Sequence, residues 1–121
     1  MSDPMEDLPY EDRIAHIRLR FVDSLGERFE EIRTALKSGP DETSRDSHVR
    51  TIHRLFHDMA GSAAMLEIEV LESAVRPAVH IAERVDAAQS ELTDDEKHEL
   101  DAIIEQAQAV AVQLREQFRP T

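Results

Sequence analysis

Apolar residues recur every three or four positions along most of the chain, which is the spacing of one buried face of an α-helix. The first such segment covers residues 10–37, and Gly26 either bends it or splits off a short extra N-terminal helix. The second segment covers residues 46–66. The apolar positions expected in the core from these two segments are Ile14, Ile17, Phe21, Leu25, Phe29, Ile32, Leu36, Val49, Ile52, Phe56, Met59, Ala63 and Leu66.

Two further helices are predicted in the second half of the chain. The third covers residues 68–85, and Pro77 should kink or divide it because proline removes a backbone hydrogen bond. The fourth begins at Thr93, which with Glu96 has the pattern of a capping box, and it stops near Pro120. The core positions expected here are Val70, Leu71, Ala74, Val75, Ala78, Ile81, Leu100, Ile103, Ile104, Ala107, Val110, Leu114 and Phe118.

Short polar connections separate these segments, and residues 38–47 combine glycine, proline, aspartate and serine. Residues 1–9 contain two prolines and are expected to form a flexible leader. Four amphipathic helices with short connections bury their apolar faces against one another. Residues 10–121 are therefore predicted to form a single all-α domain, an antiparallel four-helix bundle.

Composition restricts the function more than the fold. The 121 residues include 26 acidic and 14 basic side chains, and the net charge of −12 argues against binding to nucleic acid or to an anionic membrane surface. The chain has no cysteine, no apolar run of about 18 residues and a polar N-terminus unlike a signal peptide. We therefore expect a cytoplasmic monomer that makes transient contacts.

One histidine lies in unusual surroundings within residues 46–66. At about 100° per residue, His57 falls on the solvent side of the helix, away from the core stripe around Met59. An exposed glycine inside a helix costs about 0.5–1 kcal/mol relative to alanine, so small residues beside an imidazole suggest that a bulky partner approaches it. The small residues expected to share the surface of His57 are Ala60, Gly61 and Ala64.

The chemistry available at His57 is nucleophilic. A neutral imidazole nitrogen is a nucleophile near neutral pH and could accept a phosphoryl group from a donor docked on the small residues. Arg50 and Arg54 precede His57 by two turns and one turn, and could attract an acidic partner or screen the new negative charge. His53 is expected to flank this site and to contact the docked partner.

The sequence FHDMAGSAAML, residues 56–66, resembles the signature of histidine phosphotransfer (HPt) domains. In that signature a histidine is followed by an apolar residue at the second position, usually Lys at the third and Gly at the fourth, and by Leu-Gly at the ninth and tenth. The resemblance covers residues 14–85 and is most specific over His57–Leu66.

The resemblance implies a four-helix bundle with a phosphorylated histidine, His57, exposed on the second bundle helix. It implies a phosphoryl carrier, not an enzyme, whose partners are the receiver domain of a response regulator and a hybrid histidine kinase. No cofactor is expected on this chain, because any metal needed for transfer would belong to the receiver.

Two departures from the signature keep other interpretations open. Ala60 stands at the usual Lys, and Glu67 stands at the usual Gly, so the histidine helix should end differently or continue into the next. One alternative is a degenerate HPt-like adaptor that binds a receiver or kinase without phosphotransfer. The other is a metal site built from His53 and His57, although two ligands alone make a weak site.

Overall fold

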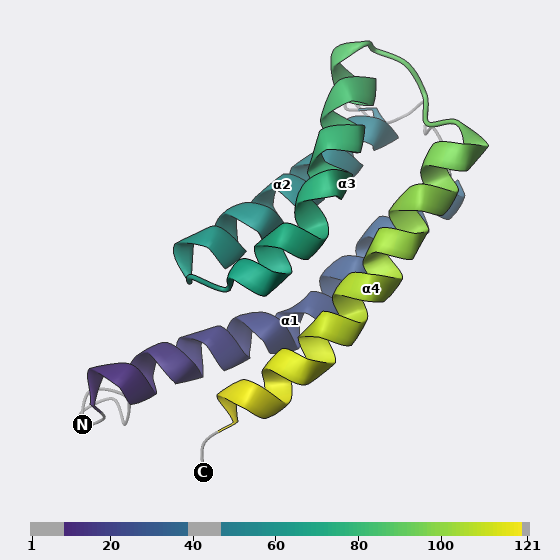
Figure 1. Ribbon diagram of the computed structural model, residues 1–121. Coiled ribbons are helices and arrows are strands. Elements are labelled where there is room, and N and C mark those ends of the chain that lie inside the picture. The colour runs from purple at the N-terminus through teal and green to yellow at the C-terminus, as the bar shows by residue number, and fades with distance from the viewer. Residues whose placement is uncertain (1–8, 39–46, 120–121) are drawn as a thin grey trace.

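The computed structural model describes residues 9–38 and 47–119, and this part of the chain folds as four helices in ring order around one core. Figure 1 shows that successive helices run in opposite directions. The extensive contacts join α1 to α2, α2 to α3, α3 to α4 and α4 to α1. This is the predicted antiparallel four-helix bundle. The helices are α1 (Tyr10–Ser38), α2 (His48–Met65), α3 (Glu69–Ala87) and α4 (Asp94–Phe118).

Neither of the two predicted interruptions divides its helix. α1 is continuous through Gly26, so no short extra helix is split off. α3 is likewise one helix through Pro77, because both Pro77 and Ser73, whose carbonyl loses its partner, lie on the exposed face where water can hydrate that group. The predicted leader and the first connection lie outside the described residues, except for Pro9, Ser38 and Ser47.

The core is entirely apolar in the described part of the chain, and most of the expected positions are buried in it. Two expectations were wrong. The side chain of Val70 is 53% exposed and that of Ile17 is 39% exposed. Val70 directly precedes the fully buried Leu71, so the helical step of about 100° turns it away from the core. The largest fully buried side chains are Phe29, Phe56, Leu25, Ile32, Ile52, Met59, Leu71, Leu100 and Ile104.

The turn between α2 and α3 is built around Glu67, which adopts a left-handed conformation with φ of 59°. The Ile68 N–H donates to the Ala63 carbonyl at 2.8 Å, and the Glu67 N–H donates to the Ala64 carbonyl at 3.1 Å. These two bonds form a Schellman motif, which normally places glycine at the left-handed position. α2 therefore ends at Met65, and the alternative that it continues into the next helix is wrong.

The turn between α3 and α4 repeats this arrangement and is followed by the predicted capping box. Gln89 has φ of 53°, and the Ser90 N–H donates to the Val85 carbonyl at 3.2 Å. At the start of α4 the Glu96 N–H donates to the Thr93 hydroxyl at 3.1 Å, and the Thr93 N–H donates to the Glu96 carboxylate at 2.9 Å. Both ends of this connection are therefore fixed by hydrogen bonds.

We expect Glu67→Gly and Gln89→Gly each to raise the free energy of unfolding by about 1 kcal/mol, because glycine adopts positive φ without steric cost. Urea unfolding followed by circular dichroism measures the change. Glu83→Gly, at an exposed position inside α3, is the matched control and should lower the free energy of unfolding by about 1 kcal/mol. Equal destabilisation by all three substitutions would show that the two left-handed positions carry no strain.

Candidate functional site

The side chain of His57 projects into solvent from the middle of α2. It is 66% exposed, whereas Ile52, Phe56 and Met59 on the opposite side of the helix are completely buried. The helix is fixed at its start by Ser47, whose hydroxyl accepts a hydrogen bond from the Arg50 N–H at 3.1 Å. The buried stripe and this cap together set the rotation of α2, and that rotation places His57 outside the bundle.

Small side chains lie beside His57, although not all three that the spacing indicates. A Cβ added at Gly61 would meet no heavy atom within 4 Å, so the space above this residue is open. Ala64 is also exposed. Ala60, by contrast, is completely buried, and its placement on the docking surface was wrong. Its direction lies about 60° from that of His57 on the side of the core stripe, so it belongs to the packed face.

Met65 extends this surface, although it was not among the docking residues predicted from the sequence. Its side chain is 77% exposed, and it follows Gly61 by four residues, which puts the two on the same face of α2. An exposed methionine next to alanine and glycine offers a flexible apolar contact to another protein. The angular position of Met65, far from the core stripe, was the signal that could have identified it.

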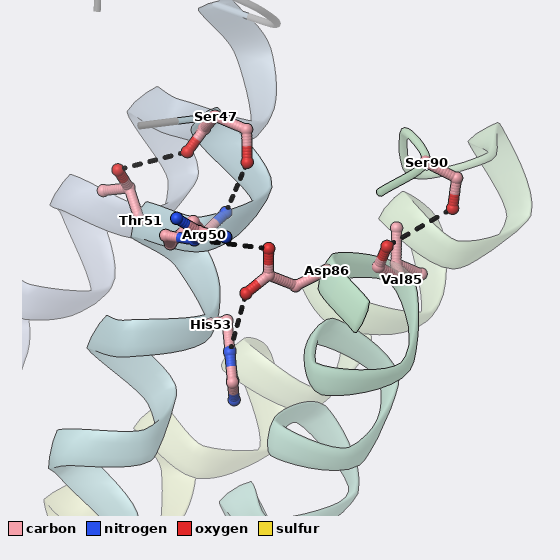
Figure 2. A network of polar contacts seen from close by, with 7 residues as sticks. All are labelled: Ser47, Arg50, Thr51, His53, Val85, Asp86 and Ser90. Atoms are coloured by element: carbon pink, nitrogen blue, oxygen red, sulfur yellow. Dashed lines mark hydrogen bonds and ion pairs between the residues drawn. The ribbon is translucent and has the colours of Figure 1, made fainter. Parts of the chain in front are cut away.

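A carboxylate from the last turn of α3 organises the polar side of the site. Figure 2 shows Asp86 between Arg50 and His53. Its Oδ2 lies 3.2 Å from Nδ1 of His53, and its Oδ1 lies 3.6 Å from Nε of Arg50. The Asp86 side chain is only 16% exposed. Asp86 is 33 residues from His53 in the chain, so no local spacing could have indicated this contact.

The immediate polar neighbours of the His57 ring are Asp58 and His53. Nδ1 of His57 lies 3.8 Å from Oδ1 of Asp58, beyond hydrogen-bond distance, and both side chains are exposed. The rings of His53 and His57 meet edge to face, with centroids 6.1 Å apart. Arg54 is exposed on the same helix. The arrangement presents an exposed imidazole to solvent with basic residues on one flank.

His53 and His57 lie four residues apart, a spacing that allows both to face a metal ion from one side of α2. In the described ranges, 9–38 and 47–119, no group of three or more His, Cys, Asp or Glu side chains is placed to hold a metal ion. Nδ1 of His53 is already hydrogen-bonded to Asp86, so the pair would offer a metal only the remaining nitrogens.

Two groups with shifted pKa values, His48 and Glu96, lie at the starts of helices. Desolvation by burial lowers the pKa of His48 at the start of α2, with a raising influence from Glu91 and a lowering one from Lys97. The hydrogen bond from the Thr93 backbone lowers the pKa of Glu96 at the start of α4, assisted by Arg84. These shifts reflect burial and capping, and therefore belong to the construction of the bundle.

Comparison with known protein families matches the Hpt domain over residues 16–110, which covers all four helices in part or in full. The chain belongs to the Hpt domain family. No curated protein and no solved structure gives a match. Hpt domains act in two-component signalling as phosphocarriers and not as enzymes. Within the described residues of this Hpt domain, no helix is both long enough and apolar enough to cross a bilayer.

Gly61, beside His57, should lower the stability of the Hpt domain. Gly61→Ala is expected to raise the free energy of unfolding by about 0.5–1 kcal/mol, because a methyl group meets nothing and alanine has the higher helix propensity. Gly26→Ala is the matched control, since Gly26 is also exposed inside a helix with open space above it. Thermal and urea unfolding measure both. A loss of stability at Gly61 alone would mean that this surface is packed and not open.

Proposed function

We propose that this Hpt domain accepts a phosphoryl group on His57 from the aspartyl phosphate of a response-regulator receiver domain and passes it to another receiver. The observation that supports this most directly is the exposure of His57 beside the open space at Gly61. A receiver aspartate lies on the surface of a folded domain, so its acceptor must also be reachable by a domain-sized partner.

The transfer step needs little from the Hpt domain besides the nucleophile. Nε2 of His57 attacks phosphorus, the N–P bond forms, and the O–P bond to the receiver aspartate breaks with release of its carboxylate. We assign no cofactor to this chain and place any metal that assists the transfer on the receiver.

The proposed docking surface surrounds His57 on α2. Gly61, Ala64 and Met65 supply a low, partly apolar surface, and Arg50, His53 and Arg54 supply basic side chains on the other flank. Small residues permit close approach, while the basic flank complements the acidic residues of a partner's phosphorylation site. A hybrid histidine kinase carrying such a receiver is the proposed source of the phosphoryl group.

His57→Gln should abolish labelling of the Hpt domain. The protein is incubated with a panel of receiver domains that have been phosphorylated with radioactive acetyl phosphate, and transfer is followed by gel autoradiography. The wild-type label should be acid-labile and base-stable, as expected for phosphohistidine, because glutamine has a similar size but no nucleophilic nitrogen. His98→Gln, at an exposed position on α4, is the control and should label like the wild type.

Labelling of His57→Gln at the wild-type rate would contradict the proposal. Absence of any label in the wild type, together with binding to a receiver that survives His57→Gln, would instead establish the adaptor. That alternative is motivated by Ala60, which places a buried methyl group where the HPt signature usually has a lysine.

Gly61→Glu should separate docking from chemistry. A glutamate in the open space adds bulk and negative charge beside His57, and we expect transfer from a receiver to fall by about tenfold or more. Phosphoramidate, a small donor that needs no docking surface, should still label His57. Gly26→Glu carries the same charge on α1 and should transfer normally. Equal transfer by both variants would place the docking surface elsewhere.

A further inference from the structure

The contact between His53 and Asp86 places a second ionisable ring next to the nucleophile. The two histidines lie one helical turn apart on α2, and their ring centroids are 6.1 Å from one another. His53 is more enclosed than His57, with 24% of its side chain exposed against 66%. It is therefore a fixed neighbour of His57, held from the next helix.

Asp86 determines which nitrogen of His53 carries the proton. A carboxylate can only accept a hydrogen bond, so the 3.2 Å contact requires a proton on Nδ1. Nε2 of His53 is buried and has no hydrogen-bond partner in the described part of the chain. Figure 2 shows the ring with one nitrogen at Asp86 and the other pointing away from it. The second nitrogen is thus the one position on this ring that can take up a further proton.

The charges around His53 change when His57 is phosphorylated. A phosphoryl group brings roughly −1.5 to −2 charges at neutral pH. The charged side chains on this part of α2 are Arg50, Arg54 and Asp58, and α3 contributes Asp86. Asp86 and the phosphoryl group both favour a cationic imidazole between them, and Arg50 opposes it. Arg54 and the burial of Nε2 oppose it as well, so the added negative charge of the phosphoryl group is the change that favours uptake of the proton.

We propose that His53, oriented by Asp86, is a positioning residue that takes up a proton on Nε2 and supplies the positive charge beside phosphorylated His57. This inference rests on the proposed function. The covalent change is confined to His57, where an N–P bond forms as the bond from phosphorus to its donor breaks. His53 gains its proton from water and forms no bond to phosphorus. It thereby provides a cation that Ala60, buried in the core, cannot provide.

The experiment uses the full chain and phosphoramidate as the phosphoryl donor, so that no partner protein is needed. Nitrogen NMR of the imidazole rings should show His53 with its proton on Nδ1 in the free protein and with both nitrogens protonated after phosphorylation at the same pH. His53→Gln, which cannot become cationic, should be labelled on His57 about tenfold more slowly. His53→Arg restores a cation and should recover most of the rate, which a purely structural role for the ring would not allow.

A second test variant and a control variant complete the experiment. Asp86→Asn should release the fixed tautomer of His53 and slow labelling, whereas His98→Gln should change neither. Thermal unfolding checks that each variant is folded, and the NMR measurement on the wild type needs no variant. If His53 keeps one proton after phosphorylation, or His53→Gln labels at the wild-type rate, the inference is wrong while His57 remains the acceptor. If phosphoramidate labels no histidine in the wild type, the proposed function fails as well.

Discussion

The packing of α2 against α3 determines what surrounds His57. This is the most extensive helix pair in the bundle, and small residues on both helices are completely buried: Ala60, Ala63, Ala78 and Ala82. The distance between two packed helices depends on the side chains at their contact, so alanines allow α2 and α3 to approach closely. That approach carries Asp86 to within hydrogen-bond distance of His53. The polar side of the site is therefore a consequence of apolar packing.

Local rules of helix stability are broken at Gly61 and Glu67, near the histidine, and also at Gly26 and Gln89. Gly61 stands at an exposed interior position with open space above it, and Glu67 takes a left-handed conformation six residues later. Arg18 of α1 donates from Nε to the Leu66 carbonyl at 2.8 Å and so supports the turn that contains Glu67. The capping box at Thr93, far from His57 in the chain, follows the rules. Departures of this kind are therefore not confined to the surface of His57, and the open space at Gly61 matters because it lies beside an exposed ring.

The sequence predicted the features that depend on residues close together in the chain. It did not predict the features that depend on how neighbouring helices pack. Helical periodicity gave the four helices, and the pair Thr93 and Glu96 gave the start of α4, because each signal lies within a few residues. The burial of Ala60 was misjudged because its direction lies between solvent and core, and only the position of α3 decides such a case. The contact between Asp86 and His53 could not be predicted for the same reason, because Asp86 lies on α3. Pro77 does not divide α3, because the carbonyl it deprives of a partner faces water.

The exposure of His57 also limits how much of the chemistry this chain can perform alone. Enzymes accelerate group transfer by excluding water and by surrounding the reacting atoms with fixed dipoles. A ring that is 66% exposed lacks such an enclosure. Two hollows between α1 and α4 do not include His57. One is lined by residues that include Arg33, Lys37 and Lys97, and the other by residues that include Phe29 and Val112. In the proposed transfer the enclosure forms only when a receiver covers α2. The residues of this chain that matter most are then those whose position is already fixed before docking, and His53 bound to Asp86 meets that condition.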